Sequence, residues 1–184
     1  LCVRRLAESV KQPCSLNRLS NLIKATGTSC SPSTVMEYVR YLQESCLLIS
    51  IDNYVSKFVE KETIKKHYFV DNGLLHLFIN NPNTSLLENL CAITLYKKYG
   101  KGLYYYNRNI EVDFYVPDEG LVVQASYQMS DEETIEREVK ALVALHGLYP
   151  LKRAMIITYE DEGEIVRDGL KIEIRPAWKW VLEC

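Results

Sequence analysis

Two short segments near the middle of the chain, residues 111–114 and 122–126, constrain the fold most, because they have the pattern of two strands of one hairpin. They are separated by the turn-forming run Pro117-Asp118-Glu119-Gly120. Side chains alternate between the two faces of a strand, so pairing through this turn predicts a polar row beside an apolar row. The expected polar row is Glu111, Asp113, Gln124 and Ser126, and the expected apolar row is Val112, Phe114, Val123 and Ala125.

Residues 1–70 have the element order of a winged helix, which is a helix, a turn, a second helix and two strands. Ser15 is a predicted N-cap. Ser31 followed by Pro32 indicates a second helix start, because Pro is favoured at the first helical position. Apolar residues then recur at helical spacing before two short strand-like runs. The predicted elements are helices over 15–25 and 31–45, strands over 47–51 and 66–70, and a wing over 52–65.

Residues 71–184 alternate strand and helix patterns, which predicts a mixed sheet flanked by helices. This is an α/β arrangement, and the whole chain is expected to be α+β. Ser130 is the expected N-cap of the second long helix, with Asp131 in its first turn, where the helix dipole favours negative charge. The predicted elements are helices over 85–99 and 131–146 and strands over 102–107, 110–117, 121–127, 153–159 and 171–175.

The composition is that of an ordinary soluble globular protein, with 47% hydrophobic and 25% charged residues among 184. No apolar run is long enough to span a membrane, so no membrane partner is expected. The chain does not begin with Met and opens on a helical pattern, which leads us to expect a piece of a longer cytoplasmic protein. Six cysteines occur without a Cys-x-x-Cys pair, a pattern typical of free thiols in a reducing compartment and not of a zinc site.

Charge is distributed unevenly along the chain. Residues 1–70 hold ten Lys or Arg and six Asp or Glu, a net charge of +4, whereas residues 71–184 hold twelve and eighteen, a net charge of −6. The first part therefore tolerates a polyanion, and the second part repels one unless a metal or a local basic patch intervenes. No Gly-x-x-x-x-Gly-Lys-Ser/Thr run is present, so ATP binding is expected only from a domain upstream of these residues.

Several motifs together resemble one protein family. The hairpin places Asp113 on its first strand, where the PD-(D/E)XK nuclease superfamily also carries Asp, and the superfamily's second strand carries Glu-x-Lys. Four other runs of the chain are similar to the C-terminal region of prokaryotic AAA-type ATPases, in which a winged helix precedes a nuclease-like domain of unknown function. The resemblance covers nearly the whole chain and implies a restriction-endonuclease-like sheet in residues 71–184. The runs are Ser-Thr-Val-Met-Glu-Tyr-Val-Arg-Tyr-Leu at 33–42, Tyr-Phe-Val-Asp-Asn-Gly-Leu-Leu at 68–75, Leu-Leu-Glu-Asn-Leu at 86–90 and Leu-Tyr-Tyr-Tyr-Asn at 103–107.

The resemblance implies that Glu88 and Asp113 are carboxylates of a divalent-metal site, and Mg²⁺ is the ion it allows. The chain departs from the family where Gln124 and Ser126 replace the Glu and Lys of the second strand. Glutamine binds a hard cation more weakly than a carboxylate does, and serine supplies no positive charge to stabilise a reacting phosphate. We therefore expect a degenerate, inactive nuclease-like site that acts in binding or regulation, with no cofactor of its own. On this view Glu88 is an early-helix acid and Asp113 a hydrogen-bonding strand residue.

Two alternatives stay open from the sequence. The first is an active Mg²⁺-dependent nuclease that uses Glu88, Asp113 and a displaced lysine. Lys140 is one candidate for that lysine, although its spacing from Glu136 favours a surface helix pair.

The second alternative is a DNA-binding regulator that acts through the winged helix. The expected recognition helix, 31–45, offers Arg40 alongside Glu37 and Glu44, which is a weak set for reading bases. The partners expected from the sequence are an upstream ATPase domain of the same protein and either DNA or another protein. The residues expected to meet nucleic acid are Arg40, Lys57, Lys61, Lys65 and Lys66.

Overall fold

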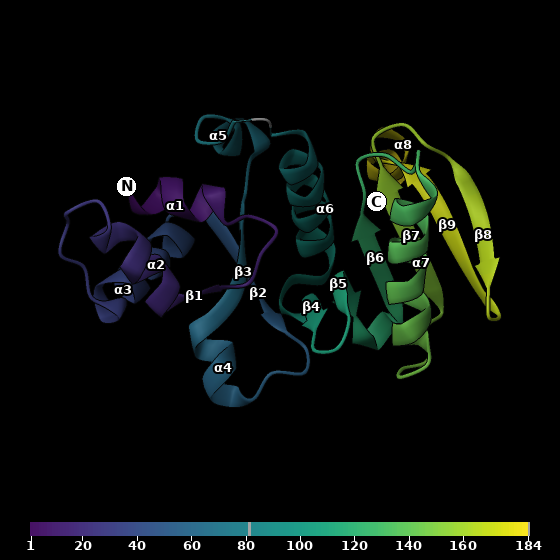
Figure 1. Cartoon of the computed structure of the whole chain (residues 1–184), viewed down its shortest axis with the longest axis horizontal. Coiled ribbons are helices and arrows are strands. Elements are labelled where there is room, and N and C mark those ends of the chain that lie inside the picture. Colours follow the sequence, from purple (N-terminus) through teal and green to yellow (C-terminus); the bar gives the residue numbers. More distant parts are fainter. Residues whose placement is uncertain (81, 184) are drawn as a thin grey trace.

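One mixed sheet runs through the whole computed structural model, which describes residues 1–80 and 82–183 (Figure 1). Within these residues the sheet has nine strands in the order β1-β3-β2-β4-β5-β6-β7-β9-β8. Helices flank it, so the predicted α+β class with a mixed sheet is confirmed. The strands are β1 (Cys14–Ser15), β2 (Leu48–Asn53), β3 (Ile64–Phe69), β4 (Tyr104–Asn107), β5 (Glu111–Val116), β6 (Leu121–Ala125), β7 (Arg153–Thr158), β8 (Gly163–Arg167) and β9 (Leu170–Pro176).

The N-terminal elements form where the sequence predicts them. The Ser15 hydroxyl accepts the Arg18 N–H at 3.1 Å, and the Ser31 hydroxyl accepts the Thr34 N–H at 3.1 Å, so each serine satisfies a backbone donor that the helix itself leaves unpaired. Strands β2 and β3 then pair antiparallel. The segment expected to be a wing contains a short helix that the sequence pattern did not indicate. The helices of this part are α1 (Cys2–Glu8), α2 (Leu16–Lys24), α3 (Pro32–Glu44) and α4 (Phe58–Thr63).

The sheet is continuous across residue 70, because β2 pairs in parallel with β4. At this junction the Asn53 side chain makes two hydrogen bonds to the Asn107 backbone, as the backbone of a neighbouring strand would. Its amide donates to the Asn107 carbonyl at 2.7 Å, and its carbonyl accepts the Asn107 N–H at 3.0 Å. Asn53 is buried, so both bonds are protected from water. The division into domains 1–70 and 71–184 stays a prediction, and its two parts share this sheet.

Replacing Asn53 with Ala is expected to lower the free energy of unfolding by about 1–3 kcal/mol, because two Asn107 backbone groups lose their partners. The exposed Asn109 provides the matched control, and Asn109→Ala is expected to change stability by less than about 0.5 kcal/mol. Urea unfolding of the three proteins measures both effects. Equal stability of the two variants would contradict the role assigned to Asn53.

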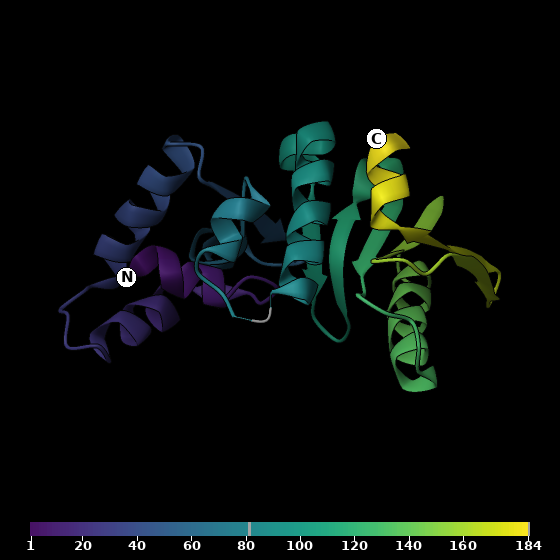
Figure 2. The same cartoon turned by 90° about the horizontal axis from the view of Figure 1, so that it is seen from above.

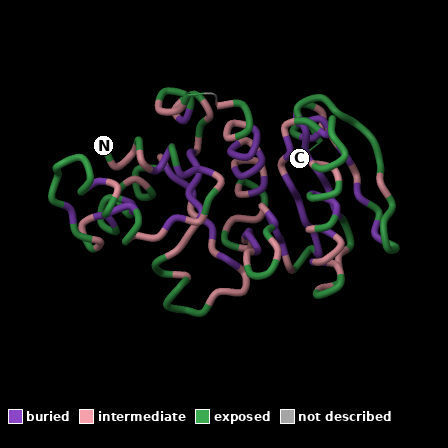
Figure 3. The backbone as a smooth tube through the Cα atoms, in the orientation of Figure 1, coloured by how far each residue is buried: buried purple, intermediate pink, exposed green. Residues whose placement is uncertain are grey.

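Helices cover both faces of the C-terminal half of the sheet. In the view from above, α6 and α8 lie on one side of the sheet and α7 on the other (Figure 2). Two hydrophobic clusters correspond to these faces, one under α6 and α8 and one under α7. The buried backbone accordingly follows the central strands and one side of each long helix (Figure 3). These helices are α5 (Asn72–His76), α6 (Asn83–Tyr99), α7 (Glu132–His146) and α8 (Ala177–Glu183), and two short helical turns are η1 (Gly100–Gly102) and η2 (Pro117–Glu119).

The hairpin forms as predicted, but its first strand does not alternate regularly. Tyr104 lies opposite Tyr115, and Tyr106 lies opposite Val112, so the two intervening residues of β5, Asp113 and Phe114, face only one residue of β4. This is a β-bulge, which reverses the alternation of side chains. Val112 therefore packs in the cluster under α7 while Phe114 packs in the cluster under α6 and α8. The expectation that both share one apolar face was wrong.

Other details of the fold differ from what the sequence predicted. The N-cap of α7 is Asp131, whose carboxylate accepts the Thr134 N–H at 2.7 Å, and not Ser130. Strands β1 and β8 and helices α5 and α8 were not predicted.

No helix within residues 1–80 and 82–183 combines the length and the apolar character that crossing a membrane requires.

Candidate functional site

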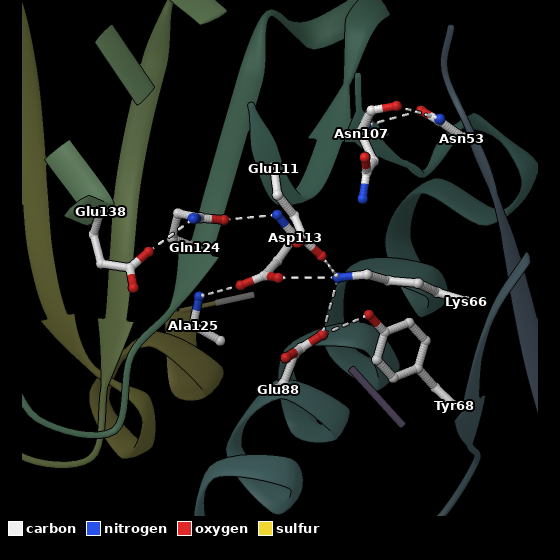
Figure 4. Close-up of polar contacts among 10 residues, drawn as sticks. All are labelled: Asn53, Lys66, Tyr68, Glu88, Asn107, Glu111, Asp113, Gln124, Ala125 and Glu138. Carbon is white, nitrogen blue, oxygen red and sulfur yellow. Dashed lines mark hydrogen bonds and ion pairs between the residues drawn. The ribbon is translucent and has the colours of Figure 1, made fainter. Parts of the chain in front are cut away.

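Four charged side chains from three elements meet at one point of the structure. Lys66 reaches from β3 toward Glu88 on α6 and toward Glu111 and Asp113 on β5 (Figure 4). The Lys66 Nζ atom lies 3.1 Å from Asp113 Oδ1, 3.4 Å from Glu88 Oε1 and 3.4 Å from Glu111 Oε1. The lysine side chain is 0% exposed, whereas the Glu111 side chain is 51% exposed. One buried ammonium group thus contacts three carboxylates at the edge of solvent.

The bulge in β5 is what aims Asp113 into this cluster. Its second carboxylate oxygen, Oδ2, accepts the Ala125 N–H of the neighbouring strand at 3.1 Å. Its own N–H donates to the Gln124 side-chain carbonyl at 2.6 Å. Side chains therefore satisfy two backbone groups next to Phe114 and Val123, where the β5–β6 ladder ends. Asp113 is held firmly in place by these bonds.

Gln124 and Ser126 are both engaged in hydrogen bonds. The Gln124 amide nitrogen donates to Glu138 Oε2 on α7 at 2.8 Å, so Gln124 links β5 to α7. Glu138 also pairs with Arg137 at 2.7 Å. The Ser126 hydroxyl donates to the Gln128 carbonyl at 3.2 Å. Both residues stabilise the local structure through these contacts.

Burial and charge determine the protonation of the cluster. Burial raises the pKa of Glu88 to about 7, and repulsion from Asp113 adds to this, against the opposing effects of Lys66 and of the Tyr68 hydroxyl, which donates to Glu88 at 2.8 Å. Burial alone would lower the pKa of Lys66, but attraction by Asp113, Glu88 and Glu111 outweighs it and raises that pKa. Lys66 therefore stays charged across the physiological range, while Glu88 titrates near neutrality.

A cleft of about 880 Å³ opens beside the cluster, between α6, α7 and the segment that follows α1. All four residues that the resemblance implied for the site line this cleft, so the structure brings them together. They are joined there by residues of both charge signs. The site residues on the lining are Glu88, Asp113, Gln124 and Ser126, and the other charged residues include Lys11, Glu111, Arg137, Glu138 and Lys140.

The donor atoms near Glu88 suit a divalent cation, but their arrangement does not. Carboxylate oxygens are the ligands that Mg²⁺ prefers, at about 2.0–2.1 Å. Here the Lys66 ammonium group stands between Glu88 and Asp113 and contacts both. Among residues 1–80 and 82–183, no group of three or more His, Cys, Asp or Glu is arranged to hold a metal ion. The residues present therefore do not fit a bound metal in this conformation.

Lys66 is the site residue that sequence reasoning missed, because it was expected to meet nucleic acid near the wing. It lies on β3 opposite Ile51 of β2, and the sequence pattern alone does not distinguish it from Lys65. Because side chains alternate between the faces of a strand, Lys66 is fully buried while Lys65 beside it is 27% accessible, and a buried lysine needs carboxylate partners. Lys140, the displaced lysine considered from sequence, is exposed on the cleft wall. Its expected partner Glu136 pairs with Arg167 at 3.3 Å.

The other residues expected at a nucleic-acid surface are distributed around α3 and α4. Arg40 pairs with Glu44 at 3.7 Å, and Lys65 pairs with Asp52 at 2.7 Å. Lys57 is exposed at the start of α4, and the Lys61 ammonium group lies 5.5 Å from the centre of the Tyr104 ring. The expectation that Lys66 meets nucleic acid was wrong, because Lys66 is buried among carboxylates and is not accessible to a phosphate.

Comparison with known proteins adds one relative. The chain is 31% identical over 183 aligned residues to an uncharacterized protein of Methanocaldococcus jannaschii, MJ1544. The alignment covers 91% of this chain and 40% of that protein, so the chain spans less than half of the relative's length. No protein-family model matches the chain. No solved structure matches it either.

Proposed function

We propose that this chain is the C-terminal accessory region of an AAA-type ATPase, in which a nuclease-like domain binds or regulates and does not cleave. Its immediate partner on this proposal is an ATPase domain upstream in the same protein, which would supply any ATP binding. DNA or a second protein is the further partner. The proposal assigns the chain itself no catalytic step.

The observation that carries the proposal is the contact of Lys66 with Glu88 and Asp113. Metal-assisted hydrolysis of a phosphodiester needs a held cation, an activated water and stabilisation of charge on the phosphate. In this chain an internal ammonium group already pairs with the two carboxylates and offsets part of their charge. Gln124 is committed to Glu138 and to the Asp113 backbone, which leaves no second-strand carboxylate to share a metal.

Two further observations support the assignment to a larger protein. The motif order resembles that of the ATPase C-terminal regions over nearly the whole chain. The relative from Methanocaldococcus jannaschii is a longer protein, of which the matching region is 40%. A non-catalytic region attached to other domains is compatible with both.

A DNA-binding regulator is less well supported by the contacts. Three of the five cations expected to meet DNA are engaged with carboxylates, namely Arg40, Lys65 and Lys66. An active nuclease with a displaced lysine is the stronger alternative, since Lys66 does converge with Glu88 and Asp113.

A cleavage assay separates the proposal from that alternative. The unmodified chain is expected to leave single-stranded and double-stranded DNA and RNA intact with either Mg²⁺ or Mn²⁺, because loss of one well-placed charge-stabilising group typically costs about a hundredfold or more in rate. The variants to run beside it are Asp113→Ala and, as a matched exposed control, Asp118→Ala. Cleavage that Asp113→Ala abolishes and Asp118→Ala preserves would refute the proposal.

A further inference from the structure

The position between Glu88 and Asp113 already contains a positive charge that belongs to the chain itself. The Lys66 ammonium group contacts one oxygen of each carboxylate and a third oxygen from Glu111. A divalent cation would need those oxygens at about 2.0–2.1 Å and would stand close to the ammonium group, with strong repulsion between the two charges. The metal and the ammonium group therefore exclude one another.

Lys66 has no open path out of this position. Its side chain is 0% exposed, and it arises from β3 opposite Ile51 of β2. The Tyr105 ring lies 5.7 Å from the ammonium nitrogen. Moving the ammonium group into solvent would require the packing around β3 to open.

The charges around the cluster are consistent with a permanent internal cation. The buried Glu88 and the partly buried Asp113 repel each other, and a positive charge between them offsets that repulsion. Lys66 supplies that charge from the N-terminal part of the chain. Tyr68, two residues along the same strand, donates to the same Glu88 oxygen at 2.8 Å.

We propose that Lys66 is the built-in cation of this site, which takes the place of a divalent metal between Glu88 and Asp113 and keeps the site metal-free. The inference rests on the proposed non-cleaving function and gives it a physical cause. The chain thus carries an internal contact that blocks metal entry. Removing the ammonium group is expected to expose a cation site lined by Glu88, Glu111 and Asp113.

The test is a calorimetric titration of the full chain with Mn²⁺. Lys66→Met is expected to bind Mn²⁺ about a hundredfold more tightly than the unmodified chain, because a repelling unit charge next to the site is removed. The gain should disappear when Asp113→Asn is added to Lys66→Met. The matched control is Lys65→Met, the neighbouring lysine whose partner is Asp52, and it should bind Mn²⁺ as the unmodified chain does.

Lys66→Gln is the second variant if Lys66→Met does not fold, since glutamine is neutral but keeps hydrogen-bond donors near the carboxylates. Circular dichroism of each variant establishes that it is folded before titration. A folded Lys66 variant that binds Mn²⁺ no better than the unmodified chain overturns the inference. If neither variant folds, the unmodified chain decides, because tight Mn²⁺ binding that Asp113→Asn abolishes also overturns it, and absence of binding supports it.

The titration measures metal binding and not cleavage, so the two proposals fail separately. An unmodified chain that binds Mn²⁺ at Asp113 but cuts no nucleic acid would overturn the role of Lys66 and leave the proposed function intact. An unmodified chain that cuts nucleic acid in an Asp113-dependent way would overturn the proposed function.

Discussion

Lys66→Met is expected to lower the free energy of unfolding by about 3–5 kcal/mol at pH values above the pKa of Glu88, because it leaves the buried Glu88 and the partly buried Asp113 without a counter-charge. The methylene part of the side chain is retained, so the loss reflects charge and not a cavity. Urea unfolding monitored by circular dichroism measures the change.

Lys65→Met provides the matched control for this prediction. Lys65 is the preceding residue on β3, and its ion pair with Asp52 is partly exposed, with side chains 27% and 32% accessible. Loss of that pair is expected to cost less than about 1 kcal/mol. Adding Glu88→Gln to Lys66→Met should recover part of the lost stability, since one of the unpaired charges is removed. Equal costs for the two lysines would contradict the role of Lys66.

Glu88→Gln is expected to change how stability depends on pH between about 4.5 and 7. The pKa of Glu88 is raised by burial from 4.5 to about 7, so the folded state binds a proton more tightly than the unfolded state. This contribution to stability is fully present below pH 4.5 and is lost as the pH rises to about 7, an effect of about 3 kcal/mol from a shift of this size.

The pKa shift of His67 changes the stability in the opposite direction over nearly the same pH range. Burial lowers the pKa of His67 from 6.5 to about 4, so its contribution is present above pH 6.5 and is lost as the pH falls toward 4. The two contributions oppose each other in the unmodified chain. Stability of Glu88→Gln should therefore rise more steeply from pH 4.5 to 6.5 than that of the unmodified chain, and stability of His67→Gln should rise less steeply. Chemical unfolding across this pH range measures the slopes, and identical slopes for all three proteins would contradict the assigned titrations.

The sequence predicted those features of the fold that depend on local chemistry. Ser15 and Ser31 start helices because their hydroxyls accept backbone N–H groups one turn later, an interaction that depends on neighbouring residues alone. The turn at 117–120 likewise follows from Pro117 and Gly120, since Gly120 adopts φ +58° and a side chain there would press against the Lys152 backbone at 3.1 Å. These signals do not need knowledge of the rest of the chain.

The features that the sequence did not predict depend on contacts between distant elements. The bulge at Asp113 and Phe114 arises from how β5 pairs with β4, and a regular alternation pattern does not contain that information. The N-cap of α7 moved by one residue, from Ser130 to Asp131, because both residues are good N-caps and the sequence pattern does not choose between them.

The candidate site was predicted only in part for the same reason. Glu88, Asp113, Gln124 and Ser126 were identified through the resemblance to a family, and the structure brings them to one cleft. Lys66 lies 22 residues before Glu88 and 47 before Asp113 in the sequence, so its role became visible only when the fold brought side chains of β3, β5 and α6 together. Lys66 supplies the positive charge of this four-residue cluster.

On this proposal a charged Lys66 occupies the space between Glu88 and Asp113 and stays there when a divalent cation is added. Heteronuclear NMR of the lysine side-chain ammonium groups tests it directly, with the Lys66 signal assigned by its absence from Lys66→Met. The account predicts a slowly exchanging, fully protonated Lys66 ammonium group whose signal does not change when Mg²⁺ is added. Loss or displacement of that signal on addition of Mg²⁺, in a chain that remains folded, would contradict it.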